Sequence, residues 1–219
     1  MQQAVSTGRT NSQLRERFVR LFKLFLLCLL AAVANRLLNV FFLYFLGVSL
    51  FLDTVFTAAV VFSAGLWPGI ATALLAWVGQ GALYGGLNPF IIVSVAEVLL
   101  IYWLKPSASW VRNPAMLERG IVSVVGVFVK LMLLYIACAL TASVLGGLID
   151  YVYHTVLGVE KFYFSASDTF KIGFLRGGIP VLAVNIFARI PVNIVDRFIV
   201  ILGGYFISRG VRRIIRQAH

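Results

Sequence analysis

The chain has 219 residues, of which 61% are hydrophobic and only 12% are charged. A soluble domain of this length needs far less apolar surface, so this composition excludes an ordinary water-soluble globule. The formal net charge of +11 would suit nucleic acid, but the cations stand in short groups beside the apolar runs. We therefore expect them to meet membrane lipid headgroups, and we expect no nucleic-acid partner.

Apolar runs separated by helix breakers predict six membrane crossings. The predicted crossings are Leu21–Phe45, Phe51–Ala64, Pro68–Tyr84, Pro89–Leu104, Gly120–Leu148 and Ile190–Ser208. No charged residue occurs from Thr54 to Ala96, a stretch long enough for two crossings of about 20 residues each. Pro68 and Pro89 stand where a helix should begin, since the first helical position does not need an N–H donor. The sequence thus predicts an all-α integral membrane protein, a bundle of six transmembrane helices.

The charges in the connections predict the orientation of this bundle. Residues 1–20, the 105–119 connection and residues 209–219 are basic, whereas residues 149–170 are net negative. Because basic connections stay inside, both termini are expected in the cytoplasm. This gives a basic N-terminal segment (1–20), a membrane domain (21–208) and a basic tail (209–219).

Residues 149–188 are predicted to form an outer loop that ends in a re-entrant or interfacial segment. Residues 171–188 are apolar enough for a seventh crossing, but that crossing would carry the arginine-rich tail outside. Arg176-Gly177-Gly178 and Pro180 also interrupt any long helix there. We therefore expect this segment to pack over the outer mouth of the bundle.

Small residues recur every four positions in two rows. One row is Gly65, Gly69 and Ala73, and the other is Ala139, Ser143 and Gly147. Such rows let helix backbones approach closely within a membrane, either inside the bundle or on a face that docks a partner. Internal packing is the preferred interpretation.

The motifs of several enzyme classes are missing. The sequence has no HExxH, no GxSxG and no glycine-rich phosphate loop, and its two histidines offer no paired haem ligands. Cys28 and Cys138 lie in separate apolar runs without a motif, which predicts two buried small side chains. We expect no enzymatic activity, no cofactor and no bound metal.

Four ionisable residues are predicted at or near membrane depth, where charged groups usually pair or line a cavity. Glu97 in the fourth crossing and Lys130 in the fifth both approach the midplane. They form either a structural ion pair or a pair that contacts a ligand. Arg36 in the first crossing and Asp53 at the start of the second suggest a structural clamp at the outer rim.

The sixth crossing begins with a polar stripe. Its members share one helix face by their spacing and are Arg189, Asn193, Asp196 and Arg197. Asn185 precedes them, and Asn88 with the rings of Trp77 and Tyr84 could add an amide and stacking surface. The stripe suits either a pocket for a polar small molecule or a purely structural network.

The order of four short motifs resembles the substrate-binding (S) components of energy-coupling factor (ECF) transporters. The motifs are Phe51-Leu-Asp53-Thr-Val-Phe-Thr57, Leu66-Trp-Pro-Gly69, Asn88-Pro89 and Ile190-Pro-Val-Asn-Ile-Val-Asp196-Arg197. The six-helix layout with cytoplasmic termini is similar too. The resemblance implies a multi-pass subunit in the inner membrane of a prokaryotic cell, which binds a vitamin or another small organic micronutrient at its outer side. It also implies a membrane coupling subunit and two ATPase subunits as partners in trans.

The resemblance further implies a ligand among the outer halves of the last three helices and the first loop. Candidate site residues are then Glu97, Lys130, Asn185, Asn193 and Asp196, with Asn88 and Asp53 at the rim. Two departures matter. The first helix carries Cys28-x-x-x-Ala32 where the family often has an Ala-x-x-x-Ala docking row, and the start Met1-Gln-Gln lacks the Met-His of nickel and cobalt relatives.

Two alternatives remain. Similar six-helix modules serve as input domains for signalling, and since only residues 209–219 follow the last crossing, a sensor would need a separate output partner. An intramembrane enzyme that uses Glu97 or Asp196 as acid or base would lack a second catalytic group at a defined spacing. The importer subunit is the leading hypothesis.

Overall fold

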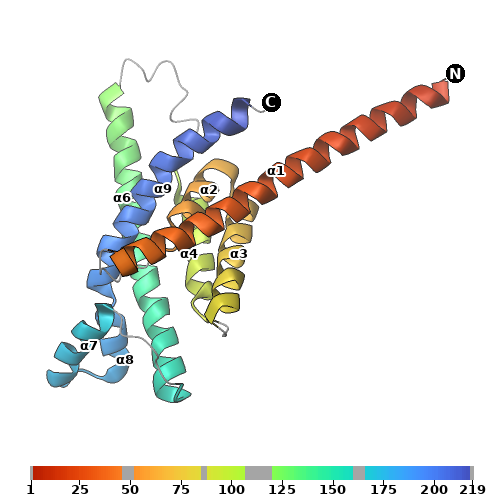
Figure 1. Cartoon of the computed structure of the whole chain (residues 1–219). Helices are drawn as coiled ribbons and strands as arrows, with labels where there is room; N and C mark the ends of the chain where they lie inside the picture. Colours follow the sequence, from red (N-terminus) through yellow and green to blue (C-terminus); the bar gives the residue numbers. More distant parts are fainter. Residues whose placement is uncertain (1, 46–51, 85–87, 107–119, 160–165, 218–219) are drawn as a thin grey trace.

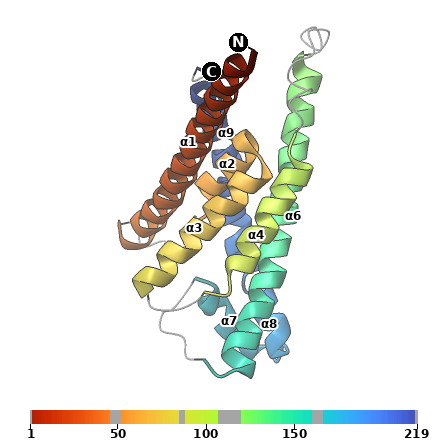
Figure 2. The same cartoon turned by 90° about the vertical axis from the view of Figure 1, so that its right-hand side faces the viewer.

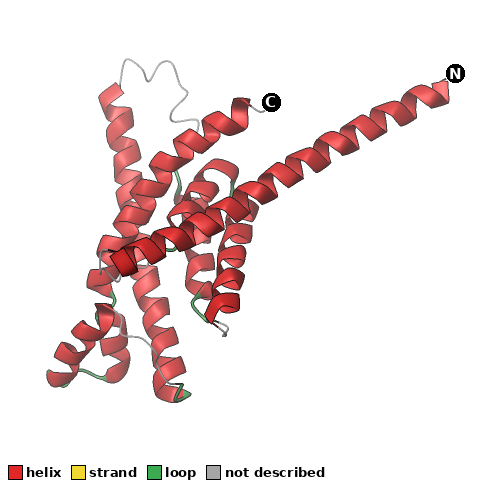
Figure 3. Cartoon of the chain, in the orientation of Figure 1, coloured by secondary structure: helices red, strands yellow, loops and turns green. Residues whose placement is uncertain are grey.

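The computed structural model describes residues 2–45, 52–84, 88–106, 120–159 and 166–217, and every element in these ranges is a helix (Figure 3). The helices are α1 (Gln2–Phe45), α2 (Val55–Ala64), α3 (Leu66–Tyr84), α4 (Ile91–Leu104), α6 (Gly120–Asp150), the π-helix η2 (Tyr151–Val156), α7 (Ala166–Arg176), α8 (Val181–Phe187) and α9 (Ile190–Gln217). Within the described ranges, three stretches are long and apolar enough to cross a membrane, namely Leu14–Phe42, Val124–Val156 and Val181–Arg213. The predicted all-α class is therefore confirmed, while the number of crossings stays a prediction.

The short helix α2 lies at the centre of the bundle. It packs most extensively against α9 and also contacts α1, α3 and α4 (Figures 1 and 2). Its 10 residues span about 15 Å, half of a hydrocarbon layer of about 30 Å. Seven of them, from Val55 to Phe62, are buried, as expected for a helix that is apolar on all sides. Much of the predicted Phe51–Ala64 crossing is thus an interior helix.

Helix α1 packs on this centre through one narrow stripe. Cys28, Ala31, Ala32 and Asn35 are buried, and their spacing of three and four residues places them on one face. Asn35 makes two hydrogen bonds to α2: its Nδ2 donates to Thr57 Oγ1 at 2.9 Å, and its Oδ1 accepts from Phe56 N at 2.8 Å. The helix begins at Gln2 rather than Leu21, and its N-terminal part extends beyond the other helices (Figure 1).

Two donors next to α2 and α4, Gly65 and Lys105, bind the same carbonyl group, that of Val61. Gly65 has φ 99°, a conformation that suits glycine, and its N–H donates to Val61 O at 3.2 Å. Lys105, directly after α4, donates from Nζ to the same oxygen at 3.2 Å. Burial lowers the pKa of the Lys105 amine, and Arg212 on α9 lowers it further. The C-terminal ends of α2, α4 and α9 are therefore neighbours.

The region after residue 148 is more helical than a connecting loop. Helix α6 continues to Asp150 and is followed directly by η2. Helices α7 and α8 are separated by Gly177, Gly178 and Pro180, with Gly178 at φ 74°. Both short helices pack near one end of α6 (Figure 2). The location of 149–188 at the outer face of a membrane stays a prediction.

Glycines allow two close helix contacts. A Cβ on Gly204 of α9 would stand 2.7 Å from Ala58 Cβ and 3.0 Å from Val55 O on α2. A Cβ on Gly147 of α6 would stand 2.7 Å from the Cα of Ile186 on α8. Gly147 belongs to one of the predicted small-residue rows, and this contact agrees with the internal-packing interpretation of that row. Because Val55 O and Ile186 Cα are backbone atoms and Ala58 Cβ belongs to an alanine, no side-chain rotation could relieve these contacts.

We expect Gly204→Ala to destabilise the protein by about 1–3 kcal/mol, because the added methyl group forces α9 away from α2. The matched control is Gly210→Ala on the same helix, where an added Cβ meets nothing within 4 Å. The measurement is the melting temperature of each purified variant in the same detergent. Equal melting temperatures for the two variants would contradict the close α2–α9 contact.

Candidate functional site

A buried polar cluster joins α2, α4 and α9, and we call its members Thr54, Glu97, Asp196 and Arg197 the Arg197 cluster. Their side chains belong to residues that are 4%, 4%, 0% and 5% exposed, respectively. Arg197 Nη1 donates to Thr54 Oγ1 at 2.7 Å and forms an ion pair with Glu97 Oε2. Arg197 Nε lies 3.3 Å from Asp196 Oδ2. One guanidinium group thus holds three helices together.

Local structure explains how each helix presents its polar group. Thr54 is the N-cap residue of α2, but its side chain makes no capping hydrogen bond, so its hydroxyl is available to Arg197. Glu97 lies inside α4 and shares its buried face with Val93, Val98 and Ile101. Asp196 and Arg197 lie about 10 Å along α9 from its start. The cluster therefore lies among apolar side chains rather than at a helix end exposed to water.

Apolar side chains surround this cluster, so each of its buried polar atoms that lacks a hydrogen bond reduces the stability of the folded protein. Leu134, Cys138, Val200 and Ile201 are at most 1% exposed and belong to the same buried core as Val98. A buried acceptor that loses water without gaining a hydrogen bond costs about 1–3 kcal/mol, and more when it is charged. In low-dielectric surroundings the Arg197–Glu97 pair is also poorly screened.

The cluster nevertheless contains several such atoms. In the described part of the chain, Glu97 Oε1 and both carboxylate oxygens of Asp196 are buried and accept no hydrogen bond. The same holds for Oδ1 of Asp53, which directly precedes Thr54 and acts electrostatically on Arg197. Arg36 of α1 in turn acts on Asp53. Acceptors therefore outnumber the donors that reach them.

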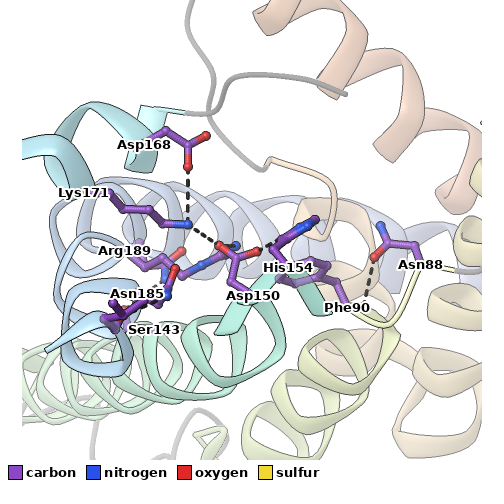
Figure 4. A network of polar contacts seen from close by, with 11 residues as sticks. Asn88, Phe90, Ser143, Asp150, His154, Asp168, Lys171, Asn185 and Arg189 are labelled. Atoms are coloured by element: carbon purple, nitrogen blue, oxygen red, sulfur yellow. Dashed lines mark hydrogen bonds and ion pairs between the residues drawn. The ribbon is translucent and has the colours of Figure 1, made fainter. Parts of the chain in front are cut away.

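A second polar network, the Asp150 cluster, lies near the end of the bundle at α7 and α8 (Figure 4). Asp150 Oδ2 is 2.7 Å from Lys171 Nζ and 2.9 Å from Arg189 Nη2, and Oδ1 is 3.8 Å from His154 Nε2. Lys171 also pairs with Asp168 at 3.3 Å. Arg189 directly precedes α9, and its guanidinium lies over the Phe90 ring at 4.8 Å. This network ties α6, α7 and α9 to the start of α4.

The predicted amide residues form hydrogen bonds within the protein. Asn193 Nδ2 donates to Ser143 Oγ at 3.0 Å and links α9 to α6. Asn185 Nδ2 donates to Val181 O at 3.0 Å within its own short helix. Asn88 Nδ2 donates to Gln80 Oε1 at 3.2 Å, while its Oδ1 accepts from Phe90 N at 3.0 Å. These hydrogen bonds stabilise the fold.

The structure brings together only part of the predicted site. Glu97 and Asp196 meet at Arg197, with Asp53 close enough to interact, whereas Asn193, Asn185 and Asn88 contact other groups. The predicted stripe is buried as a whole, but Arg189 belongs to the Asp150 cluster, Asp196 and Arg197 belong to the Arg197 cluster, and Asn193 binds Ser143. Glu97 has Arg197 as its ion-pair partner, and the Glu97–Lys130 pair stays a prediction. Arg36 donates to Asn39 Oδ1 at 3.2 Å, and the Arg36–Asp53 clamp also stays a prediction.

Sequence reasoning missed the roles of Arg197, Thr54 and Asp150. Arg197 was noted as part of a stripe, but no signal linked it to Glu97, which lies 100 positions earlier. Asp150 was used only as a marker of a negative outer segment. The burial of Cys28 and Cys138 as free thiols is confirmed. Within the described residues, no group of three potential ligands could hold a metal ion.

Comparison of the chain with protein-family models, with curated proteins and with solved structures gave no match. The resemblance to S components therefore remains an expectation from short motifs. The function is inferred below from the contacts and charges of the Arg197 cluster.

We expect Arg197→Met to destabilise the protein by about 3–5 kcal/mol, because it leaves the Glu97 carboxylate buried without its cation. Adding Glu97→Leu to this variant should restore part of the loss, since an apolar pair needs no compensation. The measurement is thermal unfolding of both single variants and the double variant in detergent. Additive losses would show that the two residues do not depend on each other.

Proposed function

We propose that this protein is the substrate-binding membrane subunit of an ATP-driven importer of the ECF type, specific for a vitamin or another small organic micronutrient. One observation carries the proposal: the Arg197 cluster places unpartnered acceptor oxygens inside an apolar helical bundle. Buried polar groups without partners are expensive, and ionisable groups at membrane depth commonly serve function. A ligand with complementary donors would satisfy these oxygens. The proposed role is binding, without catalysis.

The proposal includes six crossings with both termini in the cytoplasm of a prokaryotic cell. The alternating course of α1, α2, α3, α4, α6 and α9 supports this arrangement, and so do the two chain ends, which lie toward the same end of the bundle (Figures 1 and 2). The basic residues 1–20 and 209–219 agree with it. In this arrangement α2 and α4, with 10 and 14 residues, are too short to cross a hydrocarbon layer of about 30 Å as helices by themselves.

The proposed partners are a membrane coupling subunit and ATPase subunits in separate chains. The sequence has no phosphate-binding loop of its own, so ATP hydrolysis would come from those chains. The four motifs that resemble S components support this assignment. A sensor that signals through a separate enzyme is the competing assignment, and the composition of the purified complex separates the two.

The proposed orientation predicts that reporters at both chain ends lie on the cytoplasmic side. Fusions of a fluorescent protein to either end should fluoresce, and fusions of a periplasmic phosphatase to either end should be inactive, because basic termini are retained inside. The measurement compares both reporters at both ends in whole cells. One active and one inactive phosphatase fusion would require an odd number of crossings.

The proposed binding function predicts that a small molecule stabilises the purified protein. A ligand present at 100 times its Kd adds about 2.7 kcal/mol of stability, which is several degrees of melting temperature. The screen uses vitamins, nucleobases and amino acids, together with mass spectrometry of co-purified molecules. Glu97→Gln should abolish the shift, whereas the matched control Glu16→Gln, at an exposed position of α1, should keep it.

Purification from native membranes tests the partners. Co-purified ATPase subunits would support the importer, and a co-purified kinase or cyclase would favour the sensor. Absence of any stabilising or co-purified molecule would contradict both assignments, since each requires a bound small molecule.

A further inference from the structure

We propose that the Arg197 cluster selects an organic cation that donates hydrogen bonds, such as an amine or an amidine. This inference rests on the proposed function and names the class of its ligand. It follows from the kind of atoms that remain unpartnered, from the charge balance around them, and from a second buried cluster in the same protein that provides a comparison.

In the Arg197 cluster and at Asp53 beside it, the unpartnered buried atoms are almost all acceptors. They are Asp53 Oδ1, Glu97 Oε1 and the two Asp196 carboxylate oxygens, against a single donor, Arg197 Nε. That donor already faces Asp196 Oδ2 at 3.3 Å, so it leaves little capacity for a ligand acceptor. A ligand that matches this set must bring N–H or O–H donors. A ligand carboxylate or phosphate would add acceptors to a region that has too many.

The charges lead to the same class. Asp53, Glu97 and Asp196 all act on the Arg197 guanidinium, and Arg36 acts on Asp53. Asp196 is fully buried, and the cation beside it is Arg197, whose Nε lies 3.3 Å from Asp196 Oδ2 and which is also paired with Glu97. Uncompensated buried charge is strongly unfavourable. A cationic ligand would supply the missing positive charge.

The Asp150 cluster shows that this fold can pair a buried carboxylate completely. Asp150 is 2% exposed, and its oxygens face Lys171, Arg189 and His154 at 2.7, 2.9 and 3.8 Å. Neither of its oxygens is among the unpartnered atoms. Asp150 and Asp196 are thus equally buried residues of the same type with opposite degrees of pairing. The difference assigns a structural role to Asp150 and a ligand role to Asp196.

An organic cation fits the geometry better than a metal ion. The acceptors belong to residues on α4, on α9 and just before α2, and within the described residues no three potential ligands come together as a metal site. Metal ions require several oxygens at about 2.0–2.6 Å around one point. Donors distributed over an amine or an amidine can reach oxygens that are farther apart.

The first test needs no knowledge of the ligand. Asp196→Asn keeps the size of the side chain and removes a buried charge that lacks a full partner, so we expect the melting temperature of the ligand-free protein to stay constant or to rise. Asp150→Asn, the matched control, removes the acceptor charge from a fully paired group and should lower it. If Asp196→Asn lowers the melting temperature as much as Asp150→Asn does, Asp196 is structural and the proposal is overturned.

The second test compares ligand classes by thermal shift in nanodiscs at constant ionic strength. The probes are agmatine and spermidine as cations with N–H donors, and choline as a cation without them. Glutarate serves as an anionic compound and inositol as a neutral one. The micronutrient screen described above is repeated on Asp196→Asn. Agmatine or spermidine should raise the melting temperature of the wild type more than choline does, and glutarate should not change it. Asp196→Asn should weaken the binding of the stabilising cation, with an apparent Kd at least tenfold higher than that of the wild type.

Two other results separate this inference from the proposed function. If a neutral or anionic compound stabilises the wild type and Asp196→Asn equally, the protein binds small molecules but the cation inference is wrong. If no compound of any class stabilises the wild type and none co-purifies with it, the proposed binding function fails, and the inference fails with it.

Discussion

The bundle is organised around the cost of placing a guanidinium group among apolar side chains. Arg197 is almost fully buried, and it persists there because Thr54 and Glu97 contact its Nη1 and Asp196 lies beside its Nε. The contacts of Thr54 and Glu97 fix α2 and α4 relative to α9. The close approach of α2 and α9 at Gly204 has the same effect, since a short distance between these helices brings Thr54 within hydrogen-bonding reach of Arg197. Packing and polar pairing therefore depend on each other.

The two polar clusters differ in how completely their buried carboxylates are paired. At the Asp150 cluster, cations from α7 and from the residue before α9 meet one carboxylate, as expected for a group that stabilises a fold. At the Arg197 cluster, the carboxylates exceed their partners. Natural sequences tend to satisfy their interactions everywhere except where function requires otherwise. The location of the mismatch is therefore the best indication of a site.

The helices could be predicted from the sequence because their determinants are local. Pro68, Pro89 and the Gly177–Pro180 break separate the apolar runs and mark helix ends that depend on a few neighbouring residues. The candidate site was only half predictable. Glu97 and Asp196 were identified by their charge within apolar runs, but their meeting point depends on how α4 and α9 rotate and pack. Depth along a helix says how high a side chain lies, not which neighbour it faces. The ion pair between Glu97 and Arg197 was missed for that reason, and the Glu97–Lys130 pair stays a prediction.

The unsatisfied oxygens also limit what kind of change a ligand can cause. A bound molecule that donates to Glu97, Asp196 and Asp53 would connect α4, α9 and the start of α2, the three parts of the chain that already meet at Arg197. The ligand-free protein carries the cost of the unpartnered oxygens, so occupancy would remove that cost and stabilise this one arrangement of the three helices over others. Because Arg189 ties the start of α4 to the Asp150 cluster through the Phe90 ring, any shift of α4 would be opposed at that end.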